Sequence, residues 1–204
     1  NFSIIMLRII SKKINNTNEA LKQYYKCLSI RPNYPDAHNN IAIILQEQKY
    51  NDKAIFHLKK AVFYKPDYFE AYNNLGDLQK EEGKFEDAIN SLQKALSINP
   101  KSTTANNNLG NVFYKLGDFK TAINYFKSAL AINPNFVEAL NNLGNTFKKQ
   151  NNLVEAIQCF NNSLSIRPED ENIRMQKIHL QSQICDWESI EQDKNLIPTL
   201  GIND

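Results

Sequence analysis

The chain has 204 residues, and its 42% apolar content is enough to form a hydrophobic core in one or two domains. Its 24 basic and 22 acidic residues give a net charge of +2, which argues against a surface built to bind nucleic acid or membranes. The three cysteines, Cys27, Cys159 and Cys185, lack metal-ligand spacing and favour a reduced, cytoplasmic setting.

The chain opens with an apolar stretch, FSIIMLRII, that is too short to cross a bilayer and contains Arg8. It also lacks the basic lead-in of a signal peptide. Because residue 1 is asparagine rather than methionine, we expect the sequence to be a piece of a longer protein.

Residues of one kind recur along the chain every 34 positions. One series consists of prolines: Pro32, Pro66, Pro100, Pro134 and Pro168. A second consists of alanines: Ala20, Ala54, Ala88, Ala122 and Ala156. Two more hold small residues (Cys27, Ala61, Ala95, Ala129 and Ser163) and branched apolar ones (Leu7, Ile41, Leu75, Leu109 and Leu143). Four series in phase over five periods indicate an internal repeat.

Each period predicts two helices. Residues 69–82 and 85–98 both place apolar and small side chains at helical spacing, with Gly83 between them. The second helix ends before Pro100, because the residue before a proline is disfavoured in the helical conformation. The alanine and glycine positions mark close helix contacts, where a larger side chain would cost about 1–3 kcal/mol.

The 34-residue spacing and the wording NLG…GDF..AI.YF..AL.INP of residues 108–134 resemble the tetratricopeptide repeat (TPR). The resemblance implies an all-α fold, a right-handed TPR solenoid of antiparallel helix pairs. The predicted repeats are a degenerate first one at 1–34, four clear ones at 35–68, 69–102, 103–136 and 137–170, and a divergent last repeat or capping segment at 171–204.

Three features depart from the repeat pattern. In the first repeat, Arg8 stands where Gly76 stands later. In the last, Arg174 and Lys177 occupy apolar positions. Tyr50 comes one residue early relative to Phe85, so we expect the turn before it to differ locally.

A solenoid has no closed core, so its binding site is expected on the concave face. The resemblance implies that the side of each first helix opposite the core lines this face. In the four clear repeats these positions are Asn39, Asn40 and Ile43; Asn73, Asn74 and Asp77; Asn107, Asn108 and Asn111; Asn141, Asn142 and Asn145. Asparagine therefore fills ten of twelve positions, whereas 29 asparagines in 204 residues predict fewer than two.

Three interpretations of these asparagines stay open. They are soluble filler in an asparagine-rich chain, or they help adjacent helices to pack, or they bind a ligand. A primary amide offers donors and an acceptor without charge, so it can pair with the N–H and C=O of a peptide backbone. Packed helices stand about 8–10 Å apart and an extended peptide advances about 3.3 Å per residue, so one amide would meet every third peptide residue.

By position, a ladder of Asn40, Asn74, Asn108 and Asn142 resembles that of O-linked N-acetylglucosamine transferases, whose repeats hold substrate peptides. Asn73, Asp77, Asn107, Asn111, Asn141 and Asn145 complete the predicted peptide-binding set. The face is acidic early in the chain and basic later. The early acidic residues are Asp36, Glu47, Glu70, Asp77 and Glu81, with Lys80 among them; the later lysines are Lys115, Lys148 and Lys149, with Glu138 the exception.

Other sites are disfavoured. A chaperone-binding carboxylate clamp requires lysine or arginine at the position of Asn39, Asn73 or Asn107, and also at that of Asp36, Glu70 or Thr104, and none of these residues is basic. His38, His57 and His179 lack ligand partners at metal-binding spacing, and His38 is expected to be a packed core residue. We find no catalytic constellation, and no cofactor or metal is predicted.

Residues 180–202, LQSQICDWESIEQDKNLIPTLGI, resemble the junction between the repeats and the catalytic region in bacterial glycosyltransferases of the O-linked N-acetylglucosamine transferase and SPINDLY type. The leading hypothesis is a non-catalytic solenoid that binds extended protein segments and recruits them to such an enzyme. The alternative is a stand-alone scaffold. RNA binding through lysines and tyrosines is disfavoured by the balanced charge, and the oligomeric state is not predicted.

Overall fold

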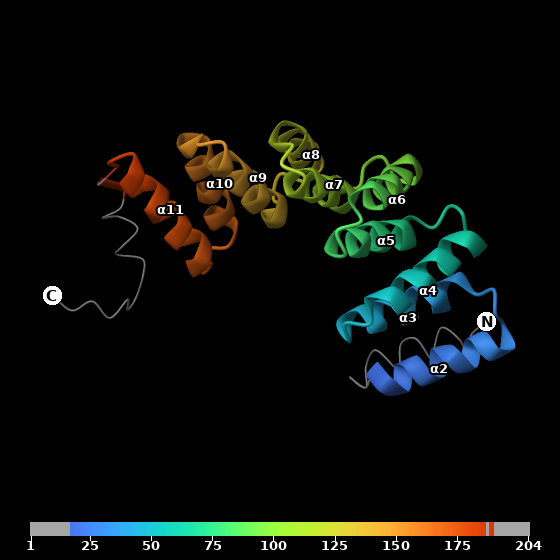
Figure 1. Cartoon of the computed structure of the whole chain (residues 1–204). Helices are drawn as coiled ribbons and strands as arrows, with labels where there is room; N and C mark the ends of the chain where they lie inside the picture. Colours follow the sequence, from blue (N-terminus) through green and yellow to red (C-terminus); the bar gives the residue numbers. More distant parts are fainter. Residues whose placement is uncertain (1–16, 187, 190–204) are drawn as a thin grey trace. The chain divides into compact units, whose positions relative to one another are not determined.

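The computed structural model describes residues 17–186 and 188–189, so the predicted first helix around Arg8 lies outside the described part. The described residues form ten α-helices and no strand, which confirms the all-α class (Figure 1). The helices are α2 (Thr17–Ile30), α3 (Pro35–Glu47), α4 (Asn51–Tyr64), α5 (Phe69–Glu81), α6 (Phe85–Ile98), α7 (Thr103–Lys115), α8 (Phe119–Ile132), α9 (Val137–Lys149), α10 (Leu153–Ile166) and α11 (Glu171–Gln183).

The helices belong to two compact units, residues 1–101 and residues 102–204. In the first unit α3 contacts α2, α4 and α5, and the buried cluster between them contains Ile41, Leu58 and Leu78. In the second unit α9 contacts α7, α8 and α10, and α10 contacts α11. Phe126 and Phe160 are fully buried there. Within each unit the helix pairs therefore pack on their neighbours, as in repeat proteins.

The turn inside each helix pair has one geometry throughout the described chain. A residue with positive φ follows each first helix; these residues are Lys49 (66°), Gly83 (73°), Gly117 (80°), Asn151 (61°) and Cys185 (58°). The next N–H returns to the carbonyl five residues earlier, as from Tyr50 to Leu45 and from Lys84 to Gln79, both 2.8 Å. This is a Schellman-type helix end.

The expectation that the turn at Tyr50 differs is therefore wrong. The helix end is set by backbone hydrogen bonds and by one left-handed residue, so moving the aromatic ring by one position leaves the backbone path unchanged. A lysine at Lys49 carries a left-handed penalty of about 1–2 kcal/mol that glycine avoids, and the surrounding hydrogen bonds hold it there.

Close helix contact within each pair depends on a small residue facing a large one. A Cβ atom placed on Gly76 would lie 2.5 Å from Leu92, and one on Gly110 would lie 2.5 Å from the ring of Phe126. Gly144 faces Phe160 in the same way. These contacts confirm the close approach predicted for the glycine positions, and they fix the distance between paired helices.

Helix α11 packs despite its polar sequence. Arg174 and Lys177, the two residues predicted to conflict with apolar positions, are both buried. The guanidinium of Arg174 donates to the carbonyl oxygen of Pro168. His38 occupies the equivalent position in α3 and contacts the carbonyl oxygen of Pro32 in the same manner, at 3.0 Å. A polar side chain is accepted at this position because a proline carbonyl is within its reach.

Among the described helices, none combines the length and the apolar character needed to cross a membrane.

Replacing Gly110 with alanine should destabilise the protein by about 1–3 kcal/mol, because the new methyl group overlaps the ring of Phe126. The repeat at 35–68 holds buried Ala42 and Leu58 at the two equivalent positions. Adding Phe126→Leu to Gly110→Ala should therefore recover part of the loss. Urea unfolding of both single variants and the double variant measures this, and strictly additive effects would contradict the contact.

Candidate functional site

The candidate site is a half-exposed stripe on each first helix. The stripe begins at the second asparagine of each pair and continues one and two turns later: Asn40, Ile43 and Glu47 on α3; Asn74, Asp77 and Glu81 on α5; Asn108, Asn111 and Lys115 on α7; Asn142, Asn145 and Lys149 on α9. Members of one stripe share a helix face because they are spaced by three and four residues. Each unit thus carries two stripes.

The two asparagines of a pair have different roles. The amide nitrogen of Asn74 donates to the side-chain oxygen of Asn39, 3.1 Å away on the preceding first helix. In the second unit Asn142 donates in the same way to Asn107 at 2.9 Å. Asn39 and Asn107 are only 5% and 8% exposed. The second asparagine of one repeat is therefore tied to the first asparagine of the repeat before.

These bonds bear on the three interpretations left open for the first asparagine of each pair. In the two bonds seen, it is a buried acceptor between neighbouring first helices, which favours the packing interpretation for that position over filler and over peptide binding. The sequence did not show this, because a projection of one helix treats every residue opposite its core as solvent-facing. The position next to the stripe instead faces the following repeat.

The bond also fixes how the second asparagine presents its amide. One N–H of Asn74 is directed to Asn39, so its Oδ1 is turned the other way and its second N–H is not consumed by that bond. The same holds for Asn142 above Asn107. A side-chain amide held in this way keeps one acceptor and one donor for a ligand, and its orientation is already set.

The amide pattern ends in α11. The position that follows Asn142 by one repeat holds Gln176, whose Oε1 accepts from Nζ of Lys148 at 2.9 Å. Within the described residues no donor reaches the buried Oδ1 of Asn141. The longer side chain of Gln176 therefore bonds to Lys148 rather than to Asn141 on the preceding first helix.

The charges near the stripes differ between the two units. In the first unit Asp77 pairs with Lys80 at 2.5 Å, and Asp36 accepts from the hydroxyl of Tyr68 at 2.7 Å. In the second unit Lys115 and Lys149 are exposed. Glu138, the exception in this basic region, forms an exposed ion pair with Arg167 at 3.2 Å. The second unit therefore offers lysines in positions where the first offers carboxylates.

A chain of hydrogen bonds through two histidines lies in the first unit, away from the stripes. Nδ1 of His38 is 2.9 Å from Nδ1 of His57, and Nε2 of His38 contacts the carbonyl oxygen of Pro32. Because a carbonyl oxygen only accepts, Nε2 of His38 carries a proton and its Nδ1 accepts from His57. Nε2 of His57 then accepts from the hydroxyl of Tyr25, 3.4 Å away on α2.

Burial, and then the neighbouring His38, lowers the pKa of His57 from 6.5 to about 4. The pKa of His38 is also lowered, chiefly by burial and further by Lys60. The two histidines therefore stay neutral at pH 7 and serve as a structural pair. The core position predicted for His38 is confirmed. Its pairing with His57 was not predicted, because helical periodicity does not show which polar positions meet across helices.

Cysteines are the remaining reactive groups in the part of the chain that the structure describes, and all of them are free. Burial raises the pKa of the Cys159 thiol to about 11, so it stays protonated and unreactive. Cys185 is exposed at the left-handed position of a turn. The described histidines, cysteines and carboxylates include no group of three that could hold a metal ion.

Models of known protein families match the chain over most of its helical part. Tetratricopeptide repeat models match residues 35–68 and 137–170, and a TPR repeat model matches residues 76–117 and 110–151. The chain belongs to the tetratricopeptide repeat family. A comparison with curated proteins found no significant match.

Several solved structures share the fold of this TPR chain at low sequence identity. Pseudomonas aeruginosa pilF is 22% identical, with a TM-score of 0.81, 94% of this chain covered and 87% of that chain. MamA is 24% identical, with a TM-score of 0.70 and coverages of 79% and 94%. YrrB, described as a TPR protein with an unusual peptide-binding site, is 20% identical, with a TM-score of 0.65 and coverages of 85% and 89%. The TPR fold is one of protein–protein interaction.

Replacing Gln176 with asparagine should stabilise the second unit by about 0.5–1.5 kcal/mol. A side chain shortened to the length of Asn142 can donate to the buried oxygen of Asn141, and one hydrogen bond is worth about that much. Gln176→Ala is the control, because it frees Lys148 without supplying a donor. Equal stabilities of the two variants in urea unfolding would show that the asparagine pair is not reproduced at this position.

Stability should fall by about 2 kcal/mol between pH 7 and pH 5 through the histidine pair. The folded-state pKa of His57 lies below its ordinary 6.5, so the unfolded chain takes up a proton that the folded chain does not, and stability is lost as pH falls from 6.5 towards 4. His38→Tyr with His57→Ser installs the residues of the next repeat, Tyr72 and Ser91. In urea unfolding, that variant should no longer lose stability between pH 7 and pH 5. If the loss persists, titratable groups other than the two histidines cause it.

Proposed function

We propose that the chain binds extended protein segments through the second asparagine of each pair, on the stripes of α3, α5, α7 and α9. The observation that carries this proposal is the bond from Asn74 to Asn39, repeated from Asn142 to Asn107. A buried acceptor holds each donor amide in one orientation. An amide that only filled space at the surface would have no need of such a support.

The proposal explains what the amide can recognise. A carbonyl oxygen and an N–H presented together match the N–H and C=O of a peptide backbone, whatever the side chains of the peptide are. Each such bond contributes about 0.5–1.5 kcal/mol net, and ordering the peptide offsets part of the sum. The site therefore holds its partner weakly and tolerates many sequences.

Residues Asp77, Asn111 and Asn145 follow the ladder asparagines on their stripes and would contact the same segment. The acidic first unit and the lysines Lys115 and Lys149 of the second add a preference for charge. A segment bound to the first unit is favoured when it is basic, and one bound to the second unit when it is acidic. YrrB supports a peptide-binding role by analogy of fold.

The process that this binding serves is inferred from the resemblance of residues 180–202 to the junction in O-linked N-acetylglucosamine transferases. We propose that the solenoid recruits acceptor proteins to such a glycosyltransferase in the cytoplasm. Most of this segment, residue 187 and residues 190–202, lies outside the described part. The second candidate is a scaffold without linked catalysis. The APC/C hetero-tetramer Cut9–Hcn1, a solved structure with a chain 23% identical to this one, supports it by analogy of fold. Reading the gene beyond Asp204 separates the two, since a stop codon there would eliminate the enzyme-linked version.

Removing the ladder amides should weaken peptide binding at least tenfold without unfolding the protein. The probe is the tightest binder from a random library of 12-residue peptides, and its affinity is measured by fluorescence anisotropy for Asn40→Ala with Asn74→Ala and for Asn108→Ala with Asn142→Ala. Thermal unfolding checks that each variant remains folded. Unchanged affinity in both folded variants would overturn the ladder.

A chemical control tests backbone recognition directly. The same peptide is N-methylated at every third residue, which removes the backbone N–H groups but keeps every side chain. Scanning the three possible phases should reveal one phase that loses affinity much more than the other two. Equal effects of all three phases would show that side chains, and not the backbone, are recognised.

A further inference from the structure

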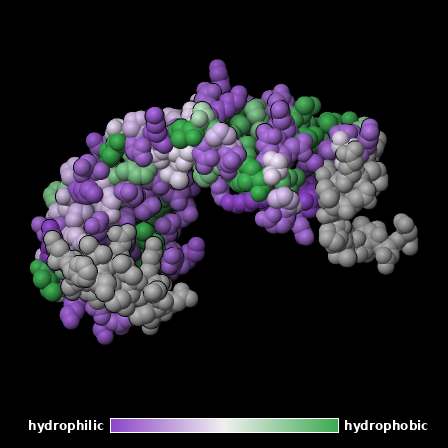
Figure 2. Space-filling model, turned by 180° about the vertical axis from the view of Figure 1, so that it is seen from behind, coloured by the Kyte–Doolittle hydropathy of each residue, from purple (hydrophilic) through white to green (hydrophobic). Residues whose placement is uncertain are grey.

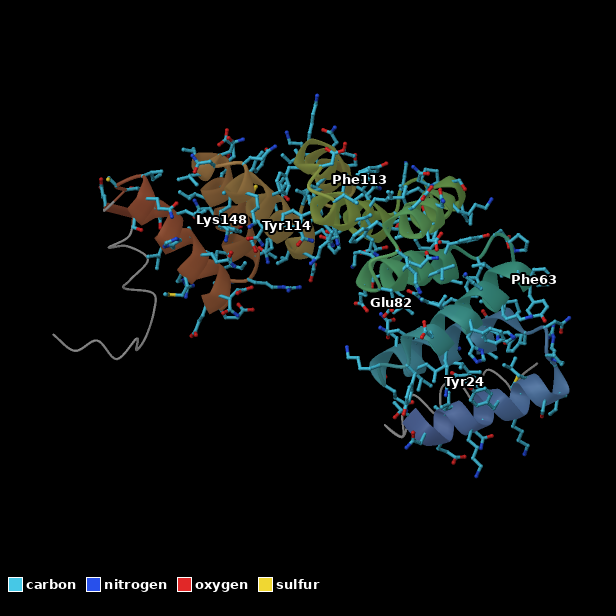
Figure 3. All side chains as sticks on the ribbon, viewed as in Figure 1. Tyr24, Phe63, Glu82, Phe113, Tyr114 and Lys148 are labelled. Carbon is cyan, nitrogen blue, oxygen red and sulfur yellow. The ribbon has the colours of Figure 1, made fainter. Side chains whose placement is uncertain are left out.

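The solvent-facing side of α4 differs from that of the later second helices, α6, α8 and α10. Phe56 is 56% exposed and Phe63 is 73% exposed. Figure 3 shows Phe63 on α4, and Figure 2 shows hydrophobic residues reaching a mostly hydrophilic surface. At the position of Phe56 the later repeats hold Asn90, Asn124 and Gln158, and at that of Phe63 they hold Ser97, Ala131 and Ser165.

The net charge of the segment that contains α4 also differs from that of the equivalent segments in later repeats. Residues 49–65 contain five lysines and one aspartate, a net charge of +4. The equivalent residues 83–99 and 151–167 are neutral, and residues 117–133 carry +1. The excess positive charge therefore belongs to the same helix as the exposed rings.

Rings and cations are interleaved on one stripe of α4. Lys53, Phe56, Lys60 and Phe63 are spaced by three, four and three residues, so they share one face of the helix. Nζ of Lys60 lies 5.8 Å from the ring centre of Phe56, and Nζ of Lys53 lies 5.2 Å from that of Tyr50. Each of these two lysines thus lies over an aromatic ring in a cation–π contact.

Helix α2 extends this surface. Tyr25 is 43% exposed, and its ring contacts His57 at a centroid distance of 5.8 Å. The ring of Phe56 also contacts His57, at 5.4 Å. The buried histidine therefore joins exposed aromatic residues from two helices. We call Tyr25, Lys53, Phe56, Lys60 and Phe63 the α4 face.

We propose that the α4 face is a second docking surface, which binds an acidic amphipathic helix of a partner protein. Phe56 and Phe63 lie two helical turns apart, so they match apolar side chains at a seven-residue spacing on the partner. Carboxylates flanking that apolar stripe pair with Lys53, Lys60 and the neighbouring lysines. Exposed aromatic residues are typical of the residues that contribute most to binding at protein interfaces.

The chemistry of the face favours a protein over a membrane. Helices that lie in a membrane surface bury a continuous apolar side in the lipid. The apolar side of α4 is already used by the core, where Ala54, Leu58 and Ala61 are fully or almost fully buried. Two separate rings with lysines between them fit individual pockets and carboxylates of a protein partner.

The test uses the full chain and a fluorescein-labelled 16-residue peptide in which leucines recur at every third and fourth position among glutamates. We expect binding in fluorescence anisotropy that weakens as NaCl is raised from 50 to 300 mM. Phe56→Asn with Phe63→Ser, which installs the residues of α6, should raise the Kd at least tenfold. Lys53→Asp with Lys60→Asn should raise it by a similar factor.

Matched controls make each outcome decisive. Asn74→Ala with Asn142→Ala should leave this binding unchanged, so failure of the asparagine ladder and failure of the α4 face are distinguishable. A peptide with lysines in place of the glutamates should not bind. No binding by the unmodified chain, equal binding by the folded α4 variants, or equal binding of the lysine peptide would each overturn the proposal. Binding to phosphatidylserine vesicles but not to the acidic peptide would assign the face to membranes instead.

Discussion

The close approach of paired helices is the constraint on which the other features rest. It requires a small residue on the first helix wherever the second helix presents a large one, as at Gly110 and Phe126 or Gly144 and Phe160. With that distance set, the first helices of neighbouring repeats come within reach of a single amide side chain. The bonds from Asn74 to Asn39 and from Asn142 to Asn107 follow. Packing thus places the asparagines before any ligand is considered.

The sequence predicted the features that arise from packing within a repeat. Helix bounds, the glycine contacts and the core position of His38 follow from apolar periodicity, because burial requires the same residue types at each recurrence. The turn at Tyr50 was misjudged because backbone hydrogen bonds, and not the aromatic residue, end the helix. The burial of Asn39 and Asn107 was missed because it depends on the following repeat, and the pairing of His38 with His57 because it depends on a second helix.

The two proposed surfaces differ in how they recognise a partner. The asparagine stripes offer uncharged amides that suit any extended backbone. The α4 face offers rings and cations that suit one kind of helix. A signal for the second surface was present in the sequence, since Phe56 and Phe63 stand where the later repeats hold polar or small residues. The 34-residue periodicity does not reveal this surface, because its residues differ from those of the later repeats.

The asparagine bond has a consequence for how the length of this protein can change. Donor and acceptor lie 35 residues apart, one residue more than the repeat. An insertion or deletion inside one of these helices turns the residues that follow it around the helix axis, so that a donor no longer faces its acceptor. After duplication or loss of a complete repeat, each donor still meets the acceptor of the repeat that now precedes it. The chain can therefore lengthen or shorten in whole repeats without redesigning its interior.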